Sequence, residues 1–191
     1  MAFDWKKGFT LDFDLTTGLS KGFTASKRKV SNMKGMYSDS AAEQALIDGD
    51  DPMVYEFHEI GVPEDPGEVA CGTSITYPGK VGNEYYMTNG HYHSILDTAE
   101  TYYCISGKGY MLCESKDGDV RPYELSPGVM VYVPKGYAHR SINTGDTPLV
   151  TFFAFRGDAG HDYGTIKQKG FRKIIVEKDG KPQVVDNPRW K

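Results

Sequence analysis

Cysteine is scarce in this sequence of 191 residues. Only three cysteines occur, Cys71, Cys104 and Cys113, and none of them stands in a CxxC or other metal-binding spacing. An odd and small number of cysteines argues against a disulfide framework. We therefore expect all three to be small apolar residues within strands.

Long hydrophobic runs and an excess of positive charge are also absent. No apolar stretch approaches the roughly 18 residues that would span a bilayer, so we expect no membrane partner. The 22 Lys and Arg residues against 26 Asp and Glu residues give a net charge of −4, whereas a nucleic-acid-binding domain is expected to be basic. Residues 1–7 lack the apolar run and cleavage site of a secretory signal. We therefore expect a cytoplasmic protein with no nucleic-acid partner.

What the sequence does contain is a series of short strand patterns from residue 53 onward. They are rich in β-branched and aromatic residues and are separated by Gly, Pro and Asp-Gly turn signals. So many short strands at close spacing predict a single all-β domain, a sandwich or a barrel. The nine segments are Met53–Glu59, Cys71–Tyr77, Glu84–Thr88, Thr101–Ile105, Tyr110–Glu114, Val120–Leu125, Met130–Val133, His139–Asn143 and Leu149–Phe155.

The region before these strands reads differently. Residues 1–52 predict an irregular arm with one or two strands and one short helix, packed on a barrel formed by residues 53–191. The helix is expected over 40–49, where Ser40 and Glu43 have the spacing of a capping box and Gly49 suits the C-terminal end.

The C-terminal part of the chain predicts a hairpin. Strand patterns over Phe171–Glu177 and Gln183–Val185 flank Asp179-Gly180, a dipeptide typical of tight hairpin turns.

The residues able to carry chemistry gather around Gly90-His91-Tyr92-His93. Residues i and i+2 of a strand point to the same face, so His91 and His93 can present two imidazoles to one point. Glu100 opens the next strand pattern and His139 begins a later one, and together they would complete a set of three nitrogens and one oxygen. Such a set suits one divalent ion among Fe(II), Mn(II), Ni(II), Co(II) and Zn(II). A lone His-x-His pair would be a weak signal, because most such pairs are ordinary strand residues.

The spacing around these residues resembles the two motifs of the cupin superfamily. Gly128-x5-Pro134-x-Gly136-x2-His139-x3-Asn143 matches the second motif completely. The first motif is matched in part by His91-x-His93 and Glu100-x6-Gly107. It departs from the generic pattern because six residues separate His93 from Glu100, where the generic motif has three or four.

Taken together, further stretches resemble one branch of that superfamily, the cupin-type phosphoglucose isomerases, over roughly residues 30–191. They are Tyr77-Pro-Gly-Lys-Val-Gly82, Thr88-Asn-Gly-His-Tyr-His93, Leu96-Asp97, Ala99-Glu100, Tyr132-Val-Pro134, Ala138-His-Arg140, Gly160-His-Asp-Tyr-Gly164 and Val185-Asp-Asn-Pro-Arg-Trp190. The resemblance implies a double-sheet β-barrel of the jelly-roll type with one or two short helices, assembled as a homodimer. It also implies reversible interconversion of glucose 6-phosphate and fructose 6-phosphate, as in glycolysis or gluconeogenesis.

The metal site that the resemblance implies is one divalent ion per subunit, with Fe(II) favoured, bound by His91, His93, Glu100 and His139. Moving hydrogen between C1 and C2 needs either proton transfer through an enediolate or a metal-assisted hydride shift, and the sequence leaves both open. A carboxylate close to both carbons can carry the proton. Glu100 is the candidate, although ligation to a metal would lower its basicity, and Tyr102 could relay the proton.

The substrate contacts are implied by the resemblance alone. The family usually has Thr where Ser74 stands, and Ser74, Thr88 and Gly90 would bind the phosphate. His161 is expected to assist ring opening and Tyr163 to contact the sugar. Phe155 stands where family members carry a Tyr, which removes one hydroxyl contact.

Two other classes of function stay open at this point. One is a different metal-dependent cupin enzyme, either an iron dioxygenase or an isomerase of another phosphosugar such as mannose 6-phosphate. The other is a non-catalytic sugar-binding cupin.

Overall fold

The structure is a computed structural model that describes residues 4–20 and 25–190. Its strands form three antiparallel sheets within these residues. The main sheet has six strands in the order β1 (Ser26–Lys29), β2 (Met53–Glu59), β3 (Val69–Thr76), β11 (Leu149–Arg156), β6 (Glu100–Ser106) and β9 (Met130–Val133). The second sheet consists of β10 (Tyr137–Asn143), β7 (Gly109–Ser115) and β8 (Val120–Leu125). The third joins β13 (Lys181–Asp186), β12 (Lys173–Lys178), β5 (Glu84–Tyr85) and β4 (Lys80–Val81).

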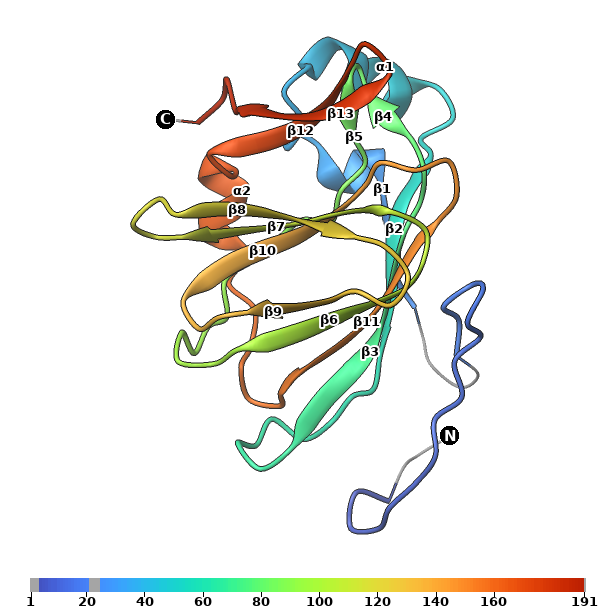
Figure 1. The fold of residues 1–191 in the computed structure, drawn as a ribbon, viewed down its shortest axis with the longest axis vertical. Helices are drawn as coiled ribbons and strands as arrows, with labels where there is room; N and C mark the ends of the chain where they lie inside the picture. Colours follow the sequence, from blue (N-terminus) through green and yellow to red (C-terminus); the bar gives the residue numbers. More distant parts are fainter. Residues whose placement is uncertain (1–3, 21–24, 191) are drawn as a thin grey trace.

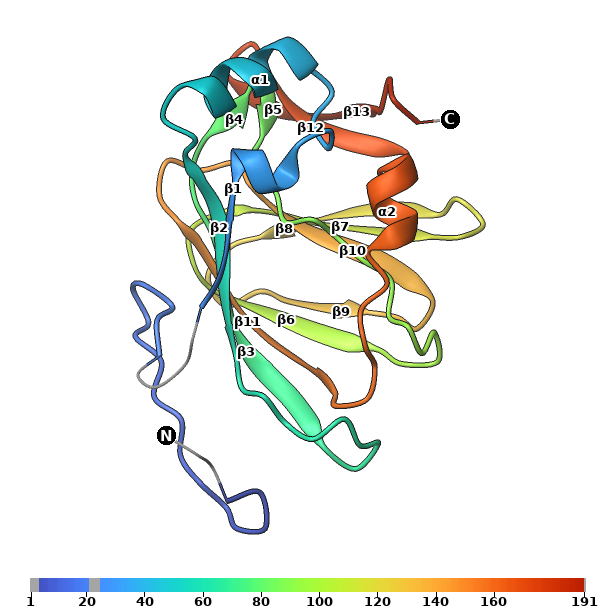
Figure 2. The ribbon, with the colours of Figure 1, turned by 180° about the vertical axis from the view of Figure 1, so that it is seen from behind.

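The first two sheets form the double-sheet barrel that the sequence predicts (Figures 1 and 2). Strand residues alternate between the two faces of a sheet, and the apolar ones that face inward make one buried cluster. It contains Ala70, Tyr102, Cys104, Met111, Cys113, Leu125, Val131, Val133, Leu149, Phe153, Phe155 and Ala159. The alternation of apolar and polar residues therefore explains both the strands and the core between them.

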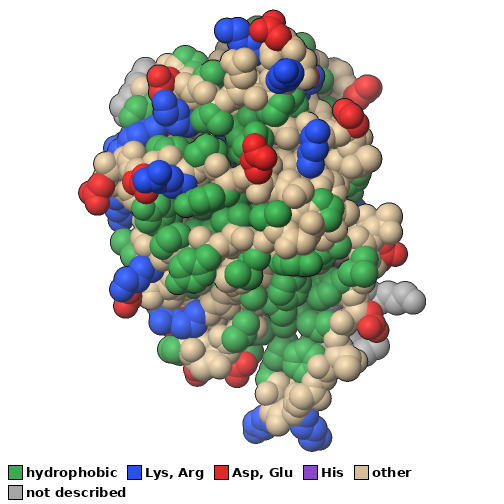
Figure 3. All heavy atoms as spheres, viewed as in Figure 1, with side chains coloured by type: hydrophobic (Ala, Val, Ile, Leu, Met, Phe, Trp, Pro, Cys, Tyr) green, Lys and Arg blue, Asp and Glu red, His purple; other side chains and the backbone are tan. Residues whose placement is uncertain are grey.

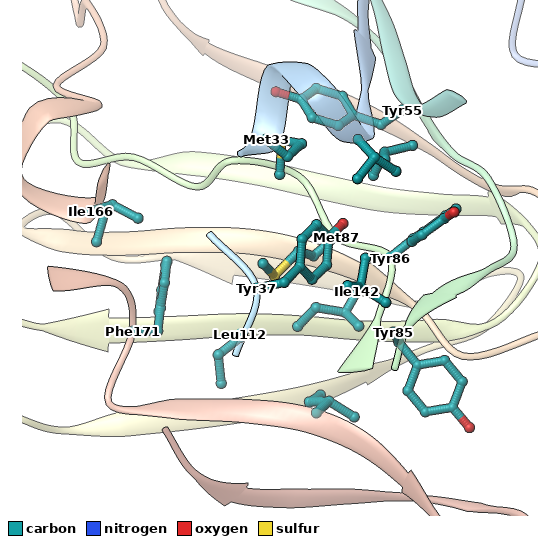
Figure 4. Packing of buried hydrophobic residues seen from close by; sticks show 14 of the residues in the cluster. Met33, Tyr37, Tyr55, Tyr85, Tyr86, Met87, Leu112, Ile142, Ile166 and Phe171 are labelled. Atoms are coloured by element: carbon teal, nitrogen blue, oxygen red, sulfur yellow. The ribbon is translucent and has the colours of Figure 1, made fainter. Parts of the chain in front are cut away.

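A second apolar cluster lies toward the third sheet and the short helices. Met33, Tyr37, Tyr86, Met87 and Phe171 belong to it, and Figure 4 shows that their side chains come from separate segments of the chain. The third sheet and helix α1 (Ser40–Asp48) lie at the same end of the barrel in both ribbon views. This cluster thus attaches the helical part of the N-terminal region to the barrel.

The N-cap of helix α1 lies one residue earlier in the chain than the sequence predicts. The cap is Asp39, whose side chain accepts hydrogen bonds from the backbone N–H groups of Ala41 at 3.1 Å and Ala42 at 2.9 Å. The predicted capping box of Ser40 and Glu43 is wrong, because Glu43 accepts instead from the backbone N–H of Gly35 at 2.8 Å. Asp and Ser are about equally good N-caps. The contact between Glu43 and Gly35 therefore decides that the cap is Asp39 and not Ser40.

Two more short helices lie within the described residues, the 3-10 helix η1 (Val30–Met33) and α2 (Gly164–Lys169). The predicted strand Glu84–Thr88 is wrong beyond Tyr85, because the chain leaves the third sheet there. Thr88 instead donates its backbone N–H to the carbonyl of Ser141 on β10 at 2.9 Å. This turn brings residues 88–93 to the mouth of the barrel.

The C-terminal hairpin is confirmed, with β12 beginning at Lys173 instead of Phe171 and β13 longer than predicted at both ends. Asp179 and Gly180 have φ angles of 53° and 71°, and positive φ at both central residues defines the tight turn type that matches the twist of a hairpin.

The three cysteines are free, with Cys104 and Cys113 buried and Cys71 partly buried in strands, as the sequence predicts.

The N-terminal arm contacts the outer face of the main sheet. Phe13 meets Phe152 edge to face, with ring centroids 5.9 Å apart, and the Thr73 hydroxyl donates to the carbonyl of Gly18. Further along, β1 pairs with β2. The division of the chain at residue 52 into arm and barrel stays a prediction. No helix in the described ranges is long and apolar enough to cross a membrane.

Candidate active site

The His-x-His segment is held in place by backbone hydrogen bonds to two other parts of the chain. His91 and His139 each donate a backbone N–H to the other's carbonyl, at 3.3 and 3.1 Å. Tyr92 and Asp162 do the same at 3.1 and 2.7 Å. The segment therefore lies between β10 and the loop that follows β11, which brings residues from distant parts of the sequence to one place.

Four side chains converge there, and they are the four predicted metal ligands. One ligand atom from each of His91, His93, Glu100 and His139 lies within 4.8 Å of all the others. Glu100 Oε2 is 3.0 Å from His93 Nε2 and 2.9 Å from His139 Nε2. The Nε2 atom of His91 is buried and has no hydrogen-bond partner among the described residues. The structure thus brings together all four residues that the sequence singles out for a metal.

The tautomer of His93 follows from its neighbour Thr98. The Thr98 hydroxyl donates its single hydrogen to the carbonyl of Ile95 at 2.6 Å. It must therefore accept in its second contact, so the Nδ1–H of His93 donates to it at 2.6 Å. A neutral imidazole protonated at Nδ1 has its lone pair on Nε2, the atom that faces Glu100. Such a partner for the second ring nitrogen is typical of metal-binding histidines.

The electrostatics of His91 and Glu100 favour the protonation states that metal binding requires. Burial lowers the pKa of His91 well below its usual range, and the neighbouring His139 lowers it further. For Glu100, burial raises the pKa, but the neighbouring His139 more than offsets this and the pKa lies below its ordinary value. Neutral imidazoles and an ionised carboxylate are the forms that coordinate a divalent cation. The residues present therefore fit a metal ion.

Three residues of the cluster, His91, Glu100 and His139, line one pocket. Its aromatic walls come from β2, β6, β11 and the loop after β11. The lining residues are Tyr55, Phe57, Glu59, Ser74, Thr88, Asn89, Gly90, His91, Glu100, Tyr102, His139, Ser141, Phe153, Phe155, His161 and Tyr163. Every predicted substrate-binding and catalytic residue is among them, and no Lys or Arg lines the pocket within the described ranges.

His161 and Tyr163 enter from the loop before α2. Their rings are stacked, with centroids 5.6 Å apart and planes at 13°, and the His161 ring lies 4.5 Å from that of His91. Asp162 between them accepts from the backbone N–H of Gly164 at 2.9 Å, which fixes the turn into the helix. The loop thus places an imidazole and a phenol beside the metal cluster.

Thr88 and Gly90 line the other part of the pocket. Thr88 Oγ1 accepts from the backbone N–H of Ser141 at 3.1 Å, which leaves its own hydrogen free to donate. Gly90 has a φ of 72°, and a Cβ there would lie 2.7 Å from the ring of Phe171 and 3.0 Å from Arg140 Nε. Only glycine can occupy this position, where the backbone itself forms the pocket surface.

Comparison with known proteins agrees with this geometry. The family model described as Glucose-6-phosphate isomerase (GPI) matches residues 27–190. Proteins named glucose-6-phosphate isomerase are 46% identical in Thermococcus litoralis and 44% identical in Pyrococcus furiosus. Each of these alignments spans 187 residues, 98% of this chain and at least 98% of the relative. The chain belongs to the glucose-6-phosphate isomerase family.

A partial structural similarity also occurs. Oxalate decarboxylase from Bacillus subtilis aligns with a TM-score of 0.43 and 27% identity over 56% of this chain and 26% of that protein.

Three residues that line the pocket of this isomerase were not predicted from the sequence. Tyr55, Phe57 and Glu59 alternate along β2 and line the pocket together. The period of two over Met53–Glu59 could have indicated a shared face. Which face turns inward depends on the pairing with β3, which the sequence does not show.

Phe155 forms an apolar wall of the pocket in this isomerase. Its ring centroid lies 5.8 Å from that of His93 and 5.4 Å from that of His161. Glu59 adds a carboxylate to the same pocket. Burial and the nearby charge of Glu100 raise the pKa of Glu59 to about 7.

Proposed function

We propose that this protein catalyses the reversible interconversion of glucose 6-phosphate and fructose 6-phosphate in the barrel pocket, with one divalent metal per subunit. The observation that carries the proposal is the convergence of His91, His93, Glu100 and His139 within 4.8 Å inside the pocket of a glucose-6-phosphate isomerase family member. Three imidazole nitrogens and a carboxylate oxygen suit a first-row divalent ion. Fe(II) is favoured by the family resemblance, and Mn(II), Ni(II), Co(II) and Zn(II) suit the same ligands.

The bound cation would supply positive charge beside the oxygens of C1 and C2. The chain's own residues then hold and move the proton. Glu100 is 2% exposed and would carry the proton between C1 and C2 if the reaction proceeds by proton transfer. Burial and the Glu100 charge raise the pKa of Tyr102 well above its usual range, so this phenol keeps its hydrogen and can only donate or relay.

Ring opening and phosphate binding fall to residues at the edges of the pocket. Burial lowers the pKa of His161, and a neutral imidazole can accept the proton of the anomeric hydroxyl and then donate it to the ring oxygen as the bond between C1 and that oxygen breaks. Tyr163 beside it would contact the sugar. The hydroxyls of Ser74 and Thr88 and the backbone at Gly90 would donate to the phosphate, as the resemblance implies.

A coupled assay that converts fructose 6-phosphate to glucose 6-phosphate, run with and without chelator, tests the proposal. We expect activity to disappear with chelation and to return with one equivalent of a divalent ion, with the metal content measured by elemental analysis. Full activity in metal-free protein would overturn the metal requirement. Absence of isomerisation with every ion tried, or preference for mannose 6-phosphate in a parallel assay, would overturn the substrate assignment.

The same reaction run in deuterated water separates the two routes. Proton transfer by Glu100 exposes the migrating hydrogen to exchange and puts deuterium into the product, whereas a hydride shift retains the original hydrogen.

We also propose a homodimer in the cytoplasm. β1 has one unpaired side at the edge of the main sheet. Tyr103, Met130 and Tyr132 are 46%, 61% and 58% exposed on the outward faces of β6 and β9. Figure 3 shows hydrophobic side chains gathered where the strands of the main sheet lie in Figure 1. Light scattering should give twice the 21.2 kDa of one chain, and a monomer mass at micromolar concentration would overturn the proposal.

A further inference from the structure

The pairing of the main sheet arranges the inward-facing residues in levels along the pocket. Within β3, these residues are Ser74, Gly72 and Ala70. Ser74 is opposite Phe57 of β2, and Ala70 is opposite Phe155 of β11. Each step along a strand advances about 3.3 Å, so neighbouring levels are roughly 7 Å apart.

Glu100 of the metal-binding cluster and Ser74, one of the proposed phosphate contacts, belong to different levels. Phe155 is opposite Glu100 of β6, so Glu100 shares the level of Ala70. Ser74, a proposed phosphate contact, lies two levels away along β3. The level between them contains Gly72, Phe153, Tyr102 and Glu59. Glu59 thus stands between the two ends of the pocket.

The neighbour of Glu59 leaves room for its side chain. Gly72 has no side chain, and a Cβ there would lie 2.0 Å from the carbonyl oxygen of His58, so no larger residue fits. The carboxylate of Glu59 can therefore extend across the glycine into the pocket that it lines.

Within the part of the chain that the structure describes, the Glu59 carboxylate has no hydrogen bond and no ion pair. The residue is partly buried, and its raised pKa of about 7 reflects that burial and the Glu100 charge. Because no side chain or backbone group of the described residues occupies it, the Glu59 carboxylate is free to accept hydrogen bonds from a ligand in the pocket that it lines.

We propose that Glu59 is a substrate-binding, specificity-determining residue whose carboxylate accepts hydrogen bonds from the C3 and C4 hydroxyls of the open-chain phosphosugar. The inference rests on the proposed function, which puts C1 and C2 beside Glu100 and the phosphate beside Ser74. The middle of the sugar then passes the level of Glu59. A carboxylate accepts without donating, and its negative charge repels phosphate, so the substrate enters in one orientation only.

The test compares Glu59→Ala and Glu59→Gln with the wild type and with Glu64→Gln, a control at an exposed carboxylate outside the pocket. kcat/KM is measured for glucose 6-phosphate and for analogues that lack the 3- or the 4-hydroxyl. Metal content and thermal unfolding are measured for each variant. If Glu59→Ala does not fold, the isosteric Glu59→Gln carries the comparison.

With glucose 6-phosphate we expect Glu59→Ala to lose roughly 10- to 100-fold in kcat/KM, the effect of one or two hydrogen bonds to a charged group. The loss should appear mainly in KM, and Glu59→Gln should lie between. With each analogue that lacks one of the two contacted hydroxyls, the difference in kcat/KM between wild type and variant should become smaller, which a merely structural role would not produce.

Equal kcat/KM for wild type and both variants, or the same loss with every analogue, would overturn the role of Glu59 alone. A wild-type protein that isomerises no phosphosugar would overturn the proposed function and this inference with it.

Discussion

Two buried clusters of polar and charged side chains lie on opposite sides of β10. One contains His139 and the other contains the next residue, Arg140. His139 and Arg140 are 1% and 3% exposed, and alternation along the strand sends them to different faces. His139 meets Glu100 in the pocket. Arg140 lies in the apolar cluster beyond it, with its guanidinium 4.4 Å from the centre of the Phe171 ring.

The two clusters differ in how donors and acceptors are mixed. Arg140 donates to Met87 Sδ at 2.8 Å and to the carbonyl of Asn89. Glu84, 1% exposed, lies in the same cluster and accepts from the backbone N–H of Ser38 at 2.8 Å. Each charged group there has a partner of its own within the fold. Around His139, three imidazoles and a carboxylate converge. That set suits a metal cation, whereas the contacts of Arg140 and Glu84 hold parts of the fold together.

The largest effect is expected from Glu100→Gln, which keeps the size of the side chain and one oxygen ligand but removes the base. Loss of a positioned acid or base typically costs about 10²–10⁴-fold in rate. Turnover should fall by that amount while substrate still binds, with metal occupancy measured alongside.

Near-normal turnover in the metal-replete Glu100→Gln variant would mean that Glu100 does not carry the proton. A hydride shift, or a base elsewhere in the pocket, would then be the better account.

A paired comparison of His139→Ala and Arg140→Met should separate the two clusters. We expect His139→Ala to lose metal with little change in the stability of the metal-free protein, because the site is carried by a barrel that folds independently of it. Arg140→Met should cost roughly 1–3 kcal/mol, since it leaves the carbonyl of Asn89 without its donor. Denaturant unfolding and elemental analysis measure both effects. If Arg140→Met is as stable as the wild type, the Arg140 cluster is not structural.

Thr98→Val tests the neighbour that sets the tautomer of His93. The substitution keeps the shape but removes the acceptor for Nδ1–H, and such contacts typically contribute about 10- to 100-fold in metal affinity. The Kd for the metal should weaken by that factor, while Thr101→Val, on the other face of β6, should leave it unchanged. An unchanged Kd in Thr98→Val would show that the tautomer is held by something else.

The smallest effect concerns the charge of Glu59. Because its pKa is raised from 4.5 to about 7, the folded state binds its proton more tightly than the unfolded chain does. This contribution to stability is present below about pH 4.5 and is lost as the pH rises through 7. In chelator-treated protein, Glu59→Gln should therefore unfold about 2–4 °C higher than the wild type at pH 8, the shift that roughly 1 kcal/mol produces in a chain of this size.

The difference between Glu59→Gln and the wild type should vanish near pH 4.5, and Glu64→Gln should show none. If the unfolding temperatures of Glu59→Gln and the wild type changed with pH in the same way, the raised pKa of Glu59 would be contradicted.

The sequence by itself determined much of the local structure and the four residues of the buried cluster. Period-two patterns placed β2 at Met53–Glu59 as predicted, and Asp179-Gly180 specified the hairpin turn, because both depend on residues adjacent in the chain. The spacing of His91, His93, Glu100 and His139 was sufficient to identify the cluster through its resemblance to a known family.

Two features were decided only by the tertiary structure, the cap of α1 and the register of the main sheet, because both depend on contacts between residues distant in the chain. Gly35 accounts for the capping of α1 by Asp39, because it takes the Glu43 carboxylate away from the predicted box. The register between β2, β3, β11 and β6 puts Glu59 at the level between Ser74 and Glu100. A shift of one residue in that register would turn Glu59 away from the pocket. No local pattern specifies which residues of separate strands stand side by side, since that is settled by packing of the whole barrel.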